Sequence, residues 1–155
     1  MNNIFFEERL KISKEMKNAV RDGITRVAEK EGLPDIDVCV LICKKEDIAA
    51  LNAEKRGVNA PTDVLSFPNL EFDADFKPIG DPEAERDPET GCIYLGDIAL
   101  CPDIINEHAK EYGQTPEREM TYMAVHSMYH LLGYDHMTDE DKKIMRAREK
   151  EIIGD

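Results

Sequence analysis

Residues 126–136 read HSMYHLLGYDH, and the rest of the sequence is best understood outward from this stretch. His126 and His130 are four residues apart, which is about one helical turn, so on a helix both rings project from the same face. Gly133 is expected to end that helix, because glycine enters the left-handed conformation without steric cost. The chain then turns back and can bring His136 to the same point. The spacing predicts a clamp of three imidazoles around one metal ion.

The predicted ligand set indicates an open metal site. Three imidazole ligands leave the fourth tetrahedral position free, whereas structural zinc sites are normally closed by four protein ligands, often cysteines. No cysteine lies near the motif. We expect zinc, although nickel or copper would also accept imidazole ligands. A metal in such a site can lower the pKa of a bound water to about 7, which is typical of hydrolytic enzymes.

The residue that follows the first histidine argues against one class of hydrolase. Zinc proteases with an H-E-x-x-H motif carry a general-base glutamate there, and this chain has Ser127. A serine hydroxyl has no suitable pKa for that role, although the histidine spacing is the same as in metzincin proteases. Asp135 is a candidate base only through its proximity, and the alternative is that it orients a histidine. His108 is expected to be a solvated helix residue.

Hydrophobic periodicity predicts a mixture of strands and helices around the motif. Gly, Pro and capping residues mark the ends of the helices. Strands are expected over 36–43, 63–67 and 92–100, and helices over 11–31, 46–56, 102–112, 115–132 and 138–153. The acidic segment 69–90 contains three prolines and is expected to form a long surface loop. We therefore predict an α+β fold: a small mixed sheet packed with about five helices, and a zincin-like metal site on a helix and the following turn.

Composition restricts the possible function classes. The 155 residues are 41% hydrophobic, as expected for one folded domain over residues 1–155. No apolar run is long enough to span a membrane, and residues 1–9 do not resemble a signal peptide, so we expect a cytoplasmic protein. The net charge of −13 argues against binding a polyanion over a broad surface. Eight of the acidic residues lie between positions 71 and 89, so a small basic site elsewhere is compatible with that charge.

A second informative stretch, residues 51–68, reads LNAEKRGVNAPTDVLSFP. Arg56 is expected at the end of the short helix 46–56, where its guanidinium could hold a phosphate through two parallel hydrogen bonds. The alternative is that basic residues at this helix end only complement the helix dipole. Three lysines close in sequence complete a small basic cluster: Lys44, Lys45 and Lys55. Three polar residues that follow are expected to be structural: Thr62, Asp63 and Ser66.

Together with the motif LGDIAL at 95–100, these two stretches resemble the YbeY family of bacterial metal-dependent endoribonucleases. The motifs occur in the family's order and spacing and span most of residues 51–136. The resemblance implies a zinc-dependent, single-strand-specific endoribonuclease that acts in ribosomal RNA processing, in 3′ end maturation of the small-subunit 16S rRNA, and in ribosome quality control. It also implies that the partners are single-stranded ribosomal RNA, the small ribosomal subunit and its assembly factors.

The resemblance assigns roles to four residues of this chain. His126, His130 and His136 match the family's zinc ligands, and Arg56 matches an arginine thought to face the substrate. The chain departs from the family pattern at Ser127 and at Tyr129, where glycine and leucine are usual, and Ser127 is expected to narrow the space beside the metal. Two other functions stay open: a metalloprotease-like hydrolase, and a non-enzymatic ribosome-associated factor with a structural zinc. The sequence does not predict the oligomeric state.

Overall fold

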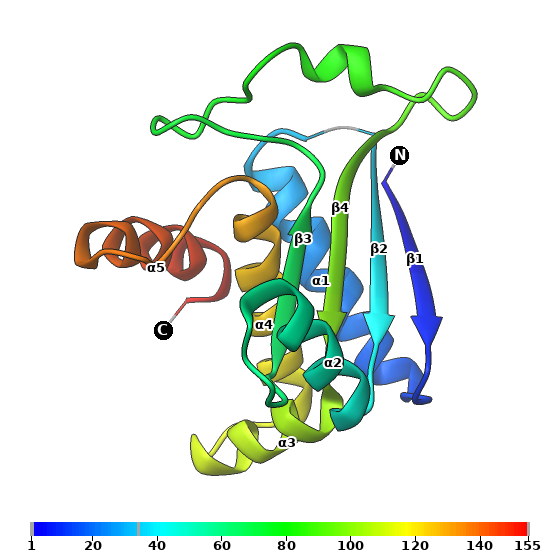
Figure 1. The fold of residues 1–155 in the computed structure, drawn as a ribbon, viewed down its shortest axis with the longest axis vertical. Helices are drawn as coiled ribbons and strands as arrows, with labels where there is room; N and C mark the ends of the chain where they lie inside the picture. The colour runs from blue at the N-terminus through cyan, green and yellow to red at the C-terminus, as the bar shows by residue number, and fades with distance from the viewer. Residues whose placement is uncertain (1, 34, 155) are drawn as a thin grey trace.

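The structure is a computed structural model that describes residues 2–33 and 35–154. A four-stranded sheet forms its centre, with the strands in the order β1-β2-β4-β3 (Figure 1). β1, β2 and β4 run parallel, and β3 is antiparallel to β4. The bounds of the strands are Asn3–Glu8 for β1, Ile36–Ile42 for β2, Val64–Pro68 for β3 and Ile93–Leu100 for β4.

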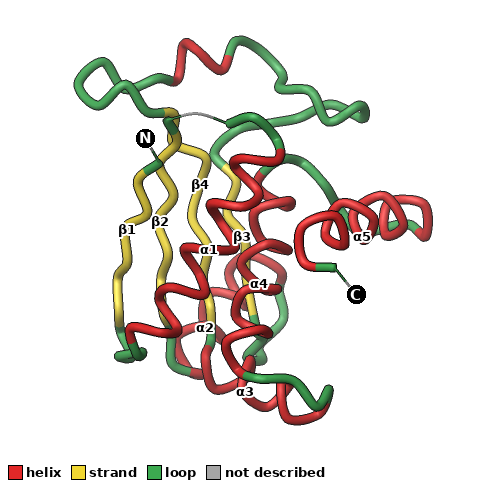
Figure 2. Tube along the Cα trace, turned by 180° about the vertical axis from the view of Figure 1, so that it is seen from behind, coloured by secondary structure: helices red, strands yellow, loops and turns green. Residues whose placement is uncertain are grey.

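Two helices, α1 and α4, cover one face of the sheet (Figure 2). α2 follows β2 and α3 follows β4, and both lie near the carboxyl ends of these parallel strands (Figure 1). α5 packs beside α4. The bounds are Lys14–Lys30 for α1, Lys45–Arg56 for α2, Pro102–Glu111 for α3, Pro116–Leu131 for α4 and Asp139–Ile153 for α5. The predicted α+β class, with a small mixed sheet and about five helices, is confirmed.

Strand β2 shows why one face of the sheet carries the core. Its residues alternate between buried and half-buried positions, with Ile36, Val38, Val40 and Ile42 on the buried face. Period-two alternation is the signature of a sheet that is covered on one side. One face of β2 therefore carries the main core, while on the other face Leu41 packs against a smaller cluster that includes Ile48 of α2.

Helix α4, which carries two of the histidines, is held close to α1 by a glycine. A Cβ atom added to Gly23 of α1 would lie 2.8 Å from the carbonyl oxygen of Thr121 and 2.9 Å from the Cβ of Ala124. Only a residue without a side chain permits so close an approach. The N-terminus of α4 is capped by Thr115, whose hydroxyl accepts from the backbone N–H of Arg118. These contacts determine where the imidazoles of α4 lie relative to the sheet.

Two expectations for the ends and loops of the chain need correction. The residue pattern did not predict β1, which pairs along its whole length with β2. The acidic segment 69–90 is not merely a surface loop, because it contains a short 3₁₀ helix, Pro82–Glu85, and packs part of itself against the core. The ring of Phe76 stacks on that of Tyr134 with centroids 4.1 Å apart. In the described part of the chain, no helix combines the length and apolar character needed to cross a membrane.

Candidate metal centre

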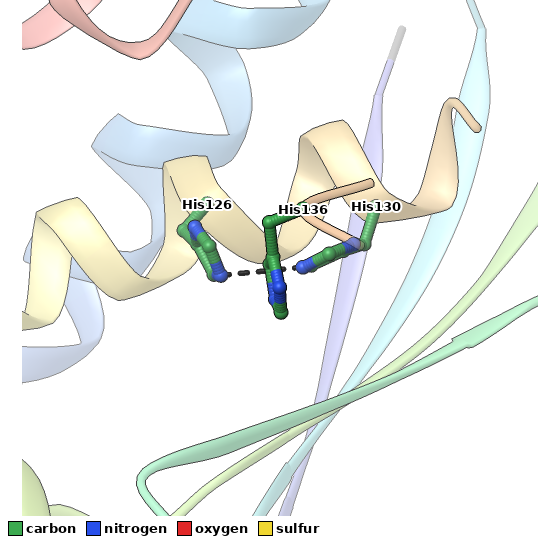
Figure 3. Close-up of side chains that lie close together, drawn as sticks. All are labelled: His126, His130 and His136. Atoms are coloured by element: carbon green, nitrogen blue, oxygen red, sulfur yellow. Dashed lines mark hydrogen bonds between the residues drawn. The ribbon is translucent and has the colours of Figure 1, made fainter. Parts of the chain in front are cut away.

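The structure brings together the three histidines that the spacing predicted to converge. One nitrogen from each of His126, His130 and His136 lies within 4.8 Å of the others. The rings of His126 and His130 project from the same face of α4, and His136 approaches from the turn that follows (Figure 3). Ring centroids lie 4.7 Å apart for His126 and His130 and 4.9 Å apart for His130 and His136. Such a group of nitrogens can hold a metal ion.

The hydrogen-bond partners of two rings determine which nitrogen faces the centre of the cluster. Nδ1 of His126 lies 2.6 Å from Oε2 of Glu149, and Nδ1 of His130 lies 3.0 Å from the carbonyl oxygen of Tyr134. Carboxylate and carbonyl oxygens accept, so we assign the proton of each neutral ring to Nδ1. Each Nε2 then carries a lone pair, and both lone pairs face the space between the rings.

The distance between these nitrogens fits a tetrahedral metal ion. The two Nε2 atoms, which are joined by the dashed line in Figure 3, lie 3.2 Å apart. Two nitrogens bound to one zinc ion at about 2.0–2.1 Å in tetrahedral geometry are about 3.3 Å apart. In the tautomers assigned above, neither Nε2 carries a proton, so the contact joins two acceptors. A cation between the two nitrogens satisfies both lone pairs at once.

His130 has a pKa well below the usual range of an imidazole. Burial, together with the neighbouring rings of His126 and His136, lowers the pKa of His130 to about 4. Desolvation, the larger cause, penalises the charged form of an imidazole. His130 is therefore neutral at physiological pH. A neutral imidazole is the form that binds a metal.

The turn between His130 and His136 is shaped by local contacts. Gly133 adopts a φ of +92°, and an added Cβ would lie 2.5 Å from the Cβ of Phe72, so the position requires glycine on two grounds. Asp135 accepts a hydrogen bond of 2.6 Å from the backbone N–H of His136. This bond supports the backbone at His136 and differs from both roles expected of Asp135, that of a base and that of a partner of a histidine ring.

Glu149 is the site residue that the sequence analysis missed. Its side chain is 4% exposed, and besides His126 it binds the hydroxyl of Tyr122, which donates to Oε1 over 2.9 Å. Burial, and secondarily the charge of Glu149, raises the pKa of Tyr122, so this hydroxyl stays protonated. A carboxylate behind a ligating histidine orients the ring and raises its basicity. One signal was available in the sequence. Glu149 comes four residues after Met145, about one helical turn, so on α5 both side chains project from the same face.

Arg56 shares a cavity with the three histidines. This cavity of about 550 Å³ is lined by Lys55 and Arg56 from the end of α2, by residues of β3, and by the histidine cluster with its turn. Arg56 is exposed and is the last residue of α2, before Gly57 in the left-handed conformation. Of the other lysines in the predicted basic cluster, Lys45 does not line this cavity and binds Glu107 over 2.8 Å. Lys55 does line it, and its ammonium lies 4.4 Å from the ring centroid of Phe67.

Two further residues differ from their expected environment. Ser127 is fully buried and its hydroxyl lies 2.5 Å from that of Ser66 on β3, so it joins α4 to the sheet and does not line the cavity around the histidines. This placement contradicts the expectation that Ser127 narrows the space beside a metal. His108 is half-buried, with Nδ1 3.3 Å from Oδ2 of Asp63, and so is not simply a solvated helix residue. Asp63 also accepts from the backbone N–H of Val64, in the structural role expected of it.

The chain matches the model of a known protein family over nearly its whole length. Residues 3–155 match the family model described as Endoribonuclease YbeY. The chain belongs to the YbeY family. The resemblance inferred from the three motifs is thereby confirmed, and the expectation of an endoribonuclease agrees with the description of the family.

Individual members of the YbeY family resemble the chain over nearly its whole length. An Endoribonuclease YbeY of Clostridium acetobutylicum is 40% identical over 154 residues, covering 96% of this chain and 92% of the relative. Another of Lachnospira eligens is 38% identical over 160 residues, covering 97% and 94%. The solution structure of a Thermotoga maritima protein superposes with a TM-score of 0.60 at 30% identity, covering 99% of this chain and 87% of that one.

Proposed function

We propose that this protein is a zinc-dependent endoribonuclease that cleaves single-stranded RNA. We further propose that it acts in the cytoplasm on ribosomal RNA, in 3′ end maturation of the small-subunit 16S rRNA and in ribosome quality control, together with the small ribosomal subunit and its assembly factors. One observation carries the proposal: an open group of three imidazole nitrogens shares a single cavity with Arg56. Membership of the YbeY family supports the same assignment.

The proposed roles follow from the chemistry of the residues. His126, His130 and His136 would hold the ion, and nickel or copper would suit the same donors. When bound, zinc supplies Lewis acidity, which polarises a phosphoryl oxygen and lowers the pKa of a coordinated water. Arg56 would bind the scissile phosphate through its planar guanidinium and offset charge that develops in the transition state. Glu149 would keep the proton of His126 on Nδ1, and the Tyr134 carbonyl would do the same for His130.

The two alternative functions have less support in this geometry. A metalloprotease of the H-E-x-x-H type needs a carboxylate directly after the first ligand, and the chain has a buried serine there. A structural zinc needs four protein ligands. Among residues 2–33 and 35–154, the three histidines form such a ligand group without a fourth histidine, cysteine or carboxylate member.

Metal removal tests the proposed function. We expect the purified protein to contain one zinc ion per chain and to cleave a single-stranded RNA oligonucleotide. Dialysis against a chelator should abolish cleavage while the circular dichroism spectrum stays that of a folded protein, and added zinc should restore it. A peptide library incubated in parallel should remain intact. Unfolding on chelation would instead support a structural zinc, and cleavage that survives complete metal removal would rule out the proposed mechanism.

Glu149→Gln tests the carboxylate behind His126. The amide keeps the volume and an acceptor oxygen, but it loses the charge that favours a basic imidazole. We expect zinc to bind about 10- to 100-fold more weakly, as is usual when such an outer partner is altered. Competition with a chromophoric chelator measures this change directly. Glu151→Gln is the matched control, because Glu151 is exposed on the same helix and pairs with Lys30 at 3.2 Å. Equal zinc affinity in the two variants would contradict the role of Glu149.

A further inference from the structure

Residues 71–79 of the acidic segment form a small hairpin that is held together by local hydrogen bonds. The backbone N–H of Ile79 donates to the carbonyl oxygen of Glu71 over 2.8 Å. The backbone N–H of Asp73 donates to the carbonyl oxygen of Lys77 over the same distance. A carboxylate oxygen of Asp73 accepts in return from the backbone N–H of Lys77 over 3.1 Å, as aspartates in turns commonly do. We call these residues the 71–79 hairpin.

Two aromatic side chains join the 71–79 hairpin to the rest of the protein. Phe72 and Phe76 are half-buried, and every other residue of the hairpin is exposed. Both rings pack against the main hydrophobic core. Burial of apolar area stabilises the contact, whereas the exposed acidic residues of the hairpin add none. The hairpin therefore packs on the protein chiefly through these two rings.

Both rings contact the turn that leads to the third histidine. The ring of Phe76 lies parallel to that of Tyr134, with an interplanar angle of 3° and centroids 4.1 Å apart. Phe72 lies so close to Gly133 that a Cβ added to the glycine would be 2.5 Å from the Cβ of Phe72. Tyr134 is 7% exposed, whereas residues 135–140 are all exposed. The hairpin thus covers the last buried residue of the turn.

His136 depends on this turn for its position. His126 and His130 lie on α4, whose packing holds both rings, whereas His136 is exposed and follows Tyr134 by two residues. The carbonyl oxygen of Tyr134 also lies 3.0 Å from Nδ1 of His130, so this one residue affects two ligands. Ligands that are held in place before the ion arrives bind it more tightly, because less conformational freedom is lost on binding.

The backbone of the hairpin is strained at the residue that stacks on Tyr134. Phe76 has a φ of +61°, in the left-handed region that bulky residues rarely adopt. Glycine would adopt this conformation without steric cost. Residues in such conformations persist where surrounding contacts compensate for the strain, and they cluster at functional sites. In this hairpin the compensating contact is the stack on Tyr134.

We propose that Phe72 and Phe76 are positioning residues of the metal centre, and that the 71–79 hairpin holds the turn 133–136 in its metal-binding conformation before the ion arrives. Loss of the stack would leave one face of Tyr134 uncovered. The turn would then gain freedom that the bound ion must remove, so the affinity for zinc would fall. This inference rests on the proposed zinc site and deepens it, because it gives the acidic segment a part in metal binding.

Phe76→Ala in the full-length protein tests the inference, with Ile79→Ala as its matched control. Both changes remove an apolar side chain from the hairpin, but Ile79 is 61% exposed. We expect Phe76→Ala to weaken zinc binding about tenfold in competition with a chromophoric chelator, as is usual for a residue that supports a metal ligand. Phe76→Tyr, which keeps a stacking ring, should restore the affinity. Thermal unfolding of the metal-free variants should remain close to that of the metal-free parent.

The outcomes separate this inference from the proposed function. Equal zinc affinity for Phe76→Ala and Ile79→Ala, in a parent protein that binds zinc, would overturn the role of the hairpin and leave the metal centre intact. A fall in thermal stability of metal-free Phe76→Ala at unchanged zinc affinity would show that the stack only stabilises the fold. A parent protein that binds no zinc would overturn both proposals. Zinc binding without cleavage of single-stranded RNA would overturn the endoribonuclease assignment alone.

Discussion

Replacing His130 with alanine is expected to remove the metal and with it the cleavage of RNA. His130 is the central member of the cluster, since its ring centroid lies within 5 Å of both other rings. Zinc bound by four protein ligands is held with about 10–16 kcal/mol, so one imidazole contributes about 3 kcal/mol, or a factor of about 10² in affinity. Metal analysis after gel filtration should fall from one zinc per chain to almost none, and RNA cleavage should fall to background.

His108→Ala provides the control for that experiment, because His108 is the one histidine outside the cluster. It should retain the zinc and the activity, with at most a small loss of stability from its contact with Asp63. His130→Ala should itself remain folded, since α4 is anchored by its packing on α1 and the sheet, independently of a metal. A His130→Ala protein that keeps a full complement of zinc would show that the ion binds elsewhere.

Arg56→Ala is expected to lower kcat about 10²- to 10³-fold, the usual effect of removing one group that stabilises developing charge. Its zinc content should not change, because Arg56 lies in the cavity of the cluster and is not one of its three members. Single-turnover cleavage of a single-stranded RNA measures the chemical step directly. Arg56→Lys should recover only part of the rate, since an ammonium keeps the charge and lacks the planar pair of donors.

Arg26→Ala is the control for Arg56→Ala. Arg26 is exposed on α1 and pairs with Asp22 at 3.1 Å, so its loss alters the net charge by the same amount at a distance from the cavity. If both variants cleave RNA at the parent rate, Arg56 has no catalytic part and its position at the end of α2 only complements the helix dipole. A loss of zinc in Arg56→Ala would instead indicate that it supports the cluster.

Much of the cluster could be predicted because its geometry is local. The four-residue spacing of His126 and His130 and the glycine after the helix follow from helix geometry and from the conformational freedom of one residue type. The structure shows the same arrangement, with Gly133 in the left-handed region. Helix bounds were also close, since caps such as Thr115 and Thr138 act over three residues.

Features that depend on distant segments could not be predicted. β1 is only six residues long, its three apolar residues are consecutive and so show no alternation, and its backbone pairs with β2, more than thirty residues away. Phe72 and Phe76 lie in an acidic stretch whose composition indicated a solvated loop, yet both rings contact the turn at Gly133 and Tyr134. Glu149 looked like one more acid on a charged helix, and it is buried against a ring 23 residues earlier.

The sequence by itself determined the three imidazoles, the helix and turn that bring them to one side, and the membership of the chain in its family. These features depend on spacings of a few residues, over which backbone geometry is nearly fixed. Only the tertiary structure decided which carboxylate supports His126, that Lys45 lies outside the cavity, and that Arg56 shares the cavity with the histidines. Those contacts arise from the packing of α2, α5 and the segment 69–90 around α4, and packing between distant segments depends on the whole chain.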